Sequence, residues 1–538
     1  MPPRPGAAPR RPFGGALAAG AYSRLLPASV PMRWFGAAIG FHMLAWLALA
    51  MAVPSWADWH GGLGWPLAAL HLVTLGTLVA AAIGASVQLL PVATRQGVRW
   101  PQLAGALWWL FVPGMLAVAL GMGLARPEWL AVGAAAVLVV LLGWGVLLAA
   151  NLAGARGMPG VVLPGWAALV GLALLMASAA ALAALWLGRP LVDAWGRDVL
   201  RALHAAAGLL GVMGLLVLGL ASILLPLFAL SPLPAERHQL VAGGAGVLAL
   251  VALGASAFAG EPAGASGAAA GQVKPLVSLA LRGTAWAAAA VALGMHLGMM
   301  RGVLRTAMRP DLGRAGTLMR IGWSSAVAAV LLAGIALLHD AGLLSRPGAT
   351  VEAAWREPLG RLVGVAIVFG WLLSFLLGVL QRILPFLASM HAAQALRTAL
   401  GAPWAEAGGA KAPGASAAKA VGAAVAPPTP RAAARPATRG AGAAHRAPTP
   451  SALTHDPALA WSLRGHAAAL ALLAAATATG WPWLAALAAA AGAAGGAALA
   501  FFFGVLVLRL RRATAAAAEA EAEAEAEAEA EADRPAGA

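Results

Sequence analysis

The sequence predicts an all-α polytopic membrane protein with about twelve transmembrane helices in three pseudo-threefold arcs of four. Three observations lead to this prediction: the composition, the number of long apolar runs, and a motif that recurs in every fourth run. Hydrophobic residues make up 61% of the 538-residue chain, and charged residues only 10%. A soluble domain needs far more charge to cover its surface, so the chain is expected in a membrane.

The apolar runs set the number of spans. A membrane helix needs about 20 mostly apolar residues, and the chain contains twelve runs of this kind. They are predicted near residues 33–54, 65–91, 101–125, 128–153, 161–187, 199–228, 237–259, 275–300, 316–339, 359–388, 461–479 and 481–508. A tight Arg126-Pro127 turn separates the third and fourth runs, and a short turn at 480–483 separates the last two.

The recurring motif is Gly-x7-Gly-x6-Pro. It appears as Gly76, Gly84 and Pro91, as Gly211, Gly219 and Pro226, and as Gly370, Gly378 and Pro385. These copies fall on the second, sixth and tenth runs, which predicts three four-helix units. The two glycines of each copy lie on roughly one helix face, where small residues allow a neighbouring helix or a flat cofactor to approach the backbone. Each proline is expected to end its span on the cytoplasmic side, because it lacks an N–H.

Arginines in alternate loops predict the topology. Basic residues gather before the first run and after the second, eighth, tenth and twelfth runs; they include Arg10, Arg11, Arg24, Arg33, Arg99, Arg301, Arg305, Arg309, Arg314, Arg320, Arg509, Arg511 and Arg512. With twelve spans they all fall on one side, which the positive-inside rule identifies as the cytoplasm. We therefore expect a multi-pass protein of the bacterial inner (cytoplasmic) membrane with both termini in the cytoplasm.

The same charge pattern bears on partners. A net charge of +16 would suggest nucleic acid in a soluble protein, but here the charge lies in loops between apolar runs, so no nucleic-acid partner is expected. The expected partners are the lipid bilayer and other respiratory or membrane subunits.

Composition also divides the chain into segments. We predict a cytoplasmic N-terminal segment over 1–32, helices one to ten over 33–391, a disordered linker over 392–457, helices eleven and twelve over 458–508, and a cytoplasmic tail over 509–538. The linker is rich in Ala and Pro and cannot bury enough apolar surface to fold. The tail is first basic and then alternates Ala and Glu, which suits either a solvated helix or a disordered segment.

Residue usage restricts the chemistry. The chain has no Cys, which excludes disulfides, thiolate metal sites and covalently attached c-type haem. The single Tyr, Tyr22, precedes the first run. A bound metal or haem iron would therefore need His, Met or carboxylate ligands.

Histidines are the candidate ligands. Ionisable residues within a membrane are rare and often functional, and neutral imidazole commonly binds haem iron and copper. His71 and His204 lie at similar depth near the outer ends of helices two and six, and His42, near the middle of helix one, is a third candidate. The alternative for each is a hydrogen bond to a nearby backbone carbonyl. His71 lies five residues before its motif glycine and His204 seven, which leaves open whether the rings face one cavity.

The remaining histidines receive other interpretations. His296 is expected near the inner interface, and His339 at the outer end of helix nine. His391 and His466 are expected in loops or at helix boundaries.

The motif helices resemble a known family. Twelve spans in three arcs, cytoplasmic termini, and the runs from His71 to Pro91 and from His204 to Phe228 resemble subunit I of the haem–copper oxidases and the related haem and copper membrane proteins of nitric-oxide metabolism. The resemblance implies a low-spin haem ligand at His71 and a copper ligand at His204, with haem b and copper as the cofactors.

The chain also departs from this family. Subunit I has a His-His pair in helix seven and His-x-His in helix ten, whereas this chain has no histidine in residues 240–259 or 359–388, and the tyrosine that assists oxygen reduction is absent. We therefore expect a diverged member in respiratory or nitrogen-oxide metabolism that is not a competent oxygen reductase; if it is an enzyme, it is an oxidoreductase. The alternative is a cofactor-free permease or assembly factor, because transporters also interrupt helices with Gly and Pro.

Overall fold

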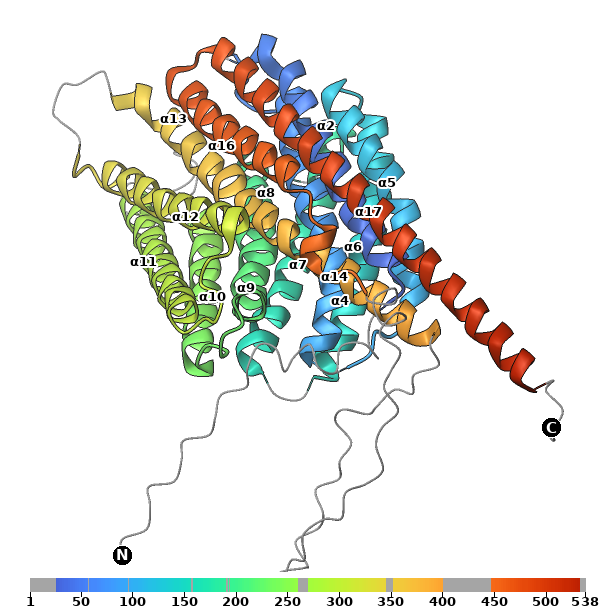
Figure 1. The fold of residues 1–538 in the computed structure, drawn as a ribbon. Helices are drawn as coiled ribbons and strands as arrows, with labels where there is room; N and C mark the ends of the chain where they lie inside the picture. Colours follow the sequence, from blue (N-terminus) through green and yellow to red (C-terminus); the bar gives the residue numbers. More distant parts are fainter. Residues whose placement is uncertain are drawn as a thin grey trace, which may run out of the picture. The chain divides into compact units, whose positions relative to one another are not determined.

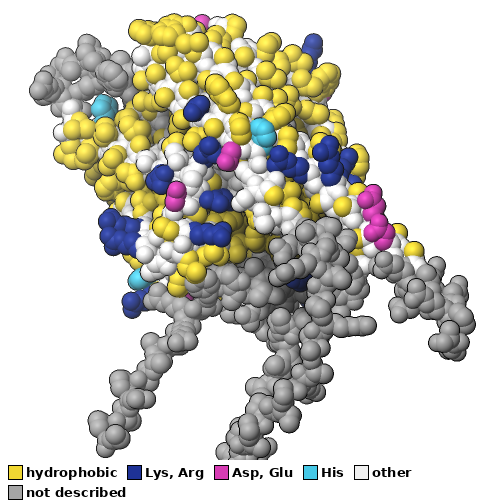
Figure 2. All heavy atoms as spheres, viewed as in Figure 1, with side chains coloured by type: hydrophobic (Ala, Val, Ile, Leu, Met, Phe, Trp, Pro, Cys, Tyr) yellow, Lys and Arg dark blue, Asp and Glu magenta, His cyan; other side chains and the backbone are white. Residues whose placement is uncertain are grey.

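The computed structural model describes residues 26–532 apart from 57, 95, 156–157, 190–191, 193, 260–269, 345–351 and 400–446. These residues form helices and no strands (Figure 1). Twelve helices are long and apolar enough to cross a membrane. Figure 2 shows hydrophobic side chains over much of the visible surface, and residues such as Trp109 and Val132 are 66% and 69% exposed. An apolar exterior of this kind is that of an all-α polytopic membrane protein, which confirms the predicted fold class.

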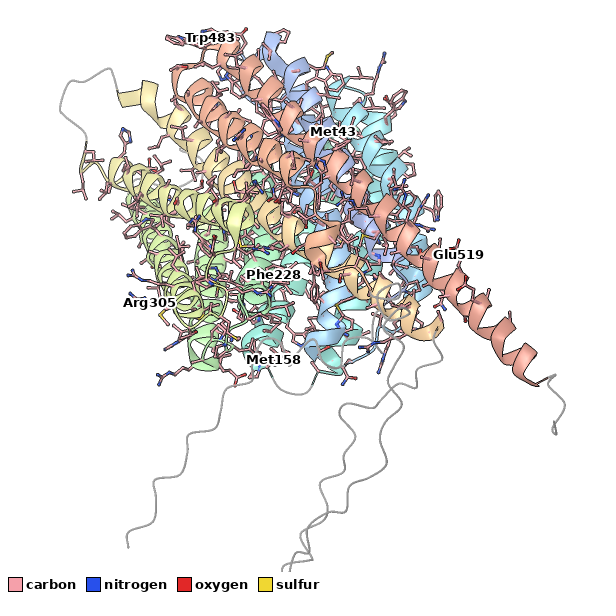
Figure 3. The ribbon with its side chains drawn as sticks, in the orientation of Figure 1. Met43, Met158, Phe228, Arg305, Trp483 and Glu519 are labelled. Carbon is pink, nitrogen blue, oxygen red and sulfur yellow. The ribbon has the colours of Figure 1, made fainter. Side chains whose placement is uncertain are left out.

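The helices follow the predicted runs. In chain order they are α2 (Ser29–Ala52) with η2 (Val53–Ser55); α3 (Trp65–His71), η3 (Leu72–Val79) and α4 (Ala80–Thr94); α5 (Pro101–Gly123); α6 (Pro127–Ala153); α7 (Pro159–Trp186); α8 (Ala194–Ala206), η4 (Ala207–Gly214) and α9 (Leu215–Ala229); α10 (Glu236–Ala259); α11 (Ala270–Arg305); α12 (Gly313–Asp340); α13 (Glu352–Val365), η5 (Ala366–Leu373) and α14 (Ser374–Ala399); α15 (Pro450–Leu453); α16 (Asp456–Thr479); and α17 (Pro482–Ala532). Figure 3 places Met158 and Arg305, from two predicted cytoplasmic loops, at one end of these helices and Trp483 at the other.

Several segment edges differ from the predicted ones. Helix α14 continues past residue 391 to Ala399, α16 begins at Asp456, and α17 includes the Ala and Glu repeat up to Ala532. Alternation of Ala and Glu is compatible with a helix because both residues have high helix propensity. The predicted N-terminal segment up to residue 25 and linker residues 400–446 lie outside the described residues.

The chain divides into two compact units. The first comprises Met1–Leu384 and His455–Gly504, and the second comprises Pro385–Thr454 and Val505–Ala538. Within the second unit, Arg509 donates hydrogen bonds to the carbonyls of Ala452 and Thr454 at 2.9 and 3.0 Å. Every candidate site residue except the motif proline Pro385 lies in the first unit.

Helix packing in the first unit repeats from arc to arc. The first helix of each arc packs on the second: α2 contacts η3, α7 contacts η4, and α12 contacts η5. The third and fourth helices pair as α5 with α6 and α10 with α11, and Gly465 of α16 faces Gly495 of α17 in the third arc. The segments η3, η4 and η5 also contact one another. The three motif helices therefore meet at the centre of the first unit, as the predicted three-arc arrangement requires.

Each motif helix contains an eight-residue π-helix, η3, η4 or η5. The first motif glycine, Gly76, Gly211 or Gly370, is the fifth residue of its π-helix in all three cases. π-helices are rare and are frequent at functional sites. Thr77 shows the wider turn directly, because its hydroxyl donates to the Leu72 carbonyl, five residues earlier, at 3.0 Å. The equal placement of three rare segments supports a common origin for the three arcs.

The motif glycines serve helix packing. Gly76 faces Phe41, Gly211 faces Gly171 and Gly370 faces Ser325, while Gly84 faces Trp34, Gly219 faces Pro164 and Gly378 faces Leu318. All these partners lie on the first helix of the same arc. A methyl group at Gly370 would lie 2.5 Å from the Ser325 Cβ atom, closer than packed carbon atoms can approach. The glycines thus allow close approach of a helix, which was one of the two predicted roles.

The motif prolines differ in how near they lie to the ends of their helices. Pro91, Pro226 and Pro385 lie inside α4, α9 and α14, and each helix continues past its proline. A proline in a membrane helix removes one hydrogen bond, but packed neighbours and local backbone adjustment can compensate for the freed carbonyl. Pro91 and Pro226 lie in the last turn of their helices, near the predicted span ends, whereas α14 continues to Ala399 and the predicted role of Pro385 is wrong.

Candidate functional site

His71 and His204 lie side by side. Their ring centroids are 6.1 Å apart and their planes are inclined by 25°. His71 is the last residue of α3, immediately before η3, and His204 lies in α8 shortly before η4. Their difference in register, two residues, is only about 3 Å along an α-helix, which side chains can span. The structure thus brings together the two candidates whose mutual orientation the sequence left open.

Both rings are held through the same nitrogen. His71 Nδ1 lies 3.0 Å from the Leu67 carbonyl, one turn earlier. Because a carbonyl only accepts, this nitrogen carries the hydrogen, and Nε2 retains its lone pair. A backbone carbonyl partner of this kind fixes the tautomer and orientation of many metal-ligating histidines.

The second ring has an equivalent partner. His204 Nδ1 lies 3.4 Å from the Ser178 hydroxyl oxygen, and that hydroxyl donates to the Leu174 carbonyl at 2.7 Å. The serine hydrogen is thus engaged, so the serine oxygen accepts from His204 Nδ1. Both imidazoles are left with Nε2 available as a ligand atom.

The separation of the two ring centroids matches that of two imidazoles on one metal ion. A metal–imidazole nitrogen bond is about 2 Å long, so two imidazoles bound to opposite sides of one ion have centroids about 6 Å apart. Both rings are only partly buried, and the residues after His204 are Ala, Ala, Ala and Gly. The two residues therefore offer two imidazole nitrogens, a ligand type that haem iron accepts.

The same residues do not fit a copper site. Imidazole copper sites use about three ligands. Within the described part of the chain, no group of three or more His, Asp or Glu side chains is arranged to hold a metal ion. The geometry supports one shared centre at His71 and His204 better than a haem ligand and a separate copper ligand.

Charged groups near the pair balance one another. Arg201 lies one turn before His204 and forms an ion pair with Asp198. Both side chains are more than half exposed, so the pair contributes little to stability.

His42 belongs to a different cluster. Its ring is buried in α2 and its Nε2 accepts a hydrogen bond of 3.4 Å from Trp46 Nε1. The centroids of Trp46 and Phe369 are 5.6 Å apart. The structure therefore does not place this third candidate beside His71 and His204.

Three buried histidines were not among the predicted site residues. His466 is 2% exposed inside α16, and its Nε2 lies 2.7 Å from the Ser374 hydroxyl. His296 is 1% exposed in α11. Starting helix eleven at residue 461 placed His466 near a helix end; the Asp456-Pro457 helix start would have placed it within the span. His391 likewise lies inside α14 and is buried.

A Cys-free chain allows a direct test of the His71 and His204 pairing. In a His71→Cys, His204→Cys double variant we expect a short bifunctional thiol reagent to join the two positions, detected as a cross-linked peptide by mass spectrometry. A His71→Cys, His238→Cys variant serves as the control, because His238 lies at the start of α10. Equal cross-linking of both variants would contradict the pairing.

Neither a family model nor a curated protein sequence matches the chain.

Proposed function

We propose that the chain is a diverged, oxidase-subunit-I-like membrane protein that binds one b-type haem between His71 and His204. The observation that carries this proposal is the pair of near-parallel imidazoles on helices two and six, 6.1 Å apart, each anchored through Nδ1. The arginine pattern favours the bacterial inner membrane with both termini in the cytoplasm. The protein would act in respiratory or nitrogen-oxide metabolism.

The protein residues would hold and insulate the cofactor. A bound haem would supply one-electron transfer. His71 and His204 would hold the haem iron through Nε2, and the hydrogen bonds of their Nδ1 atoms to Leu67 and Ser178 would fix the two rings. The absence of Cys restricts the haem to non-covalent binding.

The visible spectrum of the purified protein tests this proposal. After expression with adequate haem supply, we expect a Soret band and, on reduction, the bands of haem b, with about one haem per chain. Pyridine extraction then identifies the haem type. A colourless protein that still gives the specific cross-link between positions 71 and 204 would overturn haem binding while leaving the fold intact, and would favour the cofactor-free permease or assembly factor.

We further expect that the chain does not reduce oxygen by itself. The described residues provide two ligands at the pair and no third metal ligand beside them, and the sole Tyr precedes the first helix. Membranes that overproduce the protein in a strain without other terminal oxidases should consume oxygen no faster than membranes from the empty strain. Oxygen uptake that depends on His204 would contradict this expectation.

A further inference from the structure

Two arginines lie together at the end of α11. Arg301 and Arg305 are one helical turn apart, and both are exposed. Neither side chain forms a hydrogen bond or an ion pair with the described residues. Asp311 is the only acid between residues 301 and 320, and its carboxylate accepts from the backbone N–H of Gly313 at 2.7 Å. The two guanidinium groups therefore have no anionic partner in the described part of the chain.

The two arginines continue an open stripe along α11. Val291, Gly294, Gly298, Arg301 and Arg305 follow one another at spacings of three or four residues, so they share one face of the helix. All five residues are exposed. A methyl group added at either glycine of the stripe would meet nothing within 4 Å. Helices α9, α10 and α12 pack against α11 and leave this stripe uncovered.

The α11 stripe is apolar along the span and cationic at its end. Val291 is 51% exposed, as expected of a side chain that faces lipid. The candidate span ends at Arg305, and Figure 3 places Arg305 at the same end of the helices as Met158. Guanidinium groups form strong, charge-assisted hydrogen bonds with phosphate. An apolar stripe that ends in two arginines therefore matches the two parts of an anionic phospholipid, an acyl chain and a phosphate.

A second copy of this chain fits the α11 stripe less well. Two membrane helices can pack closely through glycines spaced four residues apart. In a symmetric pair whose axis is normal to the membrane, however, Arg301 and Arg305 of both copies would lie at the same depth, and like charges repel one another. An anionic lipid neutralises these charges instead.

We propose that the α11 stripe binds an anionic phospholipid, with its phosphate on Arg301 and Arg305 and one acyl chain along Gly294 and Gly298. Glycines allow the acyl chain to lie close to the helix backbone. Basic residues next to a membrane helix attract anionic lipids. This site is separate from the His71 and His204 pair and does not depend on the proposed haem.

Native mass spectrometry of the delipidated full chain measures the lipid binding. Phosphatidylglycerol is titrated in a neutral detergent, and phosphatidylcholine, which has no net charge, is the reference lipid. We expect phosphatidylglycerol to bind more tightly, and Arg301→Gln or Arg305→Gln to weaken its binding about fivefold each. Gly298→Leu keeps both charges and should also weaken binding, because the leucine side chain occupies the place of the acyl chain.

The matched control is Arg99→Gln, which removes an exposed arginine from another predicted cytoplasmic loop and should leave the binding unchanged. Equal affinity for the two lipids, or equal weakening by Arg99→Gln and Arg301→Gln, would show a general charge effect and overturn the proposal. Unchanged binding in the Gly298→Leu protein would overturn the position of the acyl chain. A wild-type dimer that is absent in the Gly298→Leu protein would assign the stripe to a second copy of the chain and would likewise overturn the proposal.

Discussion

Purified His71→Ala protein is expected to lose the Soret band that the wild-type protein shows. The substitution removes one of two axial nitrogens. Loss of even an indirect support of a metal ligand lowers metal affinity about 10–100-fold, so we expect at least a tenfold fall in haem content. His204→Ala should behave similarly, because the two rings face one another across a single site. Haem is quantified by pyridine extraction against protein concentration.

Two controls distinguish ligation from folding. His238→Ala changes a histidine at the start of α10, and it should keep its haem. His71→Gly opens a space that free imidazole can enter, so added imidazole should restore the spectrum. Full haem content in His71→Ala protein would exclude His71 as a ligand.

Gly492→Ala is expected to destabilise the first unit strongly. A methyl group at Gly492 would lie 2.1 Å from Trp46 Cδ2, within the ring system of a fully buried indole. The clash involves the middle of the ring, so the side chain cannot simply swing its end away. Overpacking of this kind costs about 1–3 kcal/mol or more. Unfolding in mixed detergent micelles, followed by tryptophan fluorescence, measures the change.

The matched control lies on the same helix. A methyl group at Gly504 would meet nothing within 4 Å. Gly504→Ala should therefore be neutral or stabilising by up to about 1 kcal/mol, because Ala favours the helix. Equal stability of the two variants would show that α17 does not pack against Trp46 as described.

The sequence was sufficient to predict the membrane spans because each span is a long apolar run. Each run supplies many apolar residues, and the helix boundaries follow visible features such as Gly480 and Pro127. The arc repeat could also be recognised in the sequence, because close helix contacts at Gly76 and Gly370 leave no room for a side chain.

The π-helices and the proline positions could not be predicted in this way. Whether a helix continues past Pro91 depends on neighbours that stabilise the freed carbonyl, and these neighbours are distant in sequence. The π-helical turns likewise depend on packing at the central meeting of the three motif helices.

The sequence identified the candidate site residues but could not predict how their side chains are arranged. His71 and His204 stood out because ionisable residues are rare in spans. Their pairing depends on how helices two and six approach one another, and the anchor Ser178 comes from helix five. His466 was overlooked because its partner, Ser374, is 92 residues away in the sequence.

The most direct test of the central claim is electron paramagnetic resonance of the oxidised, purified protein. Two axial imidazoles make ferric haem low-spin, so we predict a low-spin spectrum that becomes high-spin or disappears in both His71→Ala and His204→Ala proteins. A high-spin spectrum in the wild-type protein, or a low-spin spectrum unchanged in either variant, would contradict a haem shared by His71 and His204.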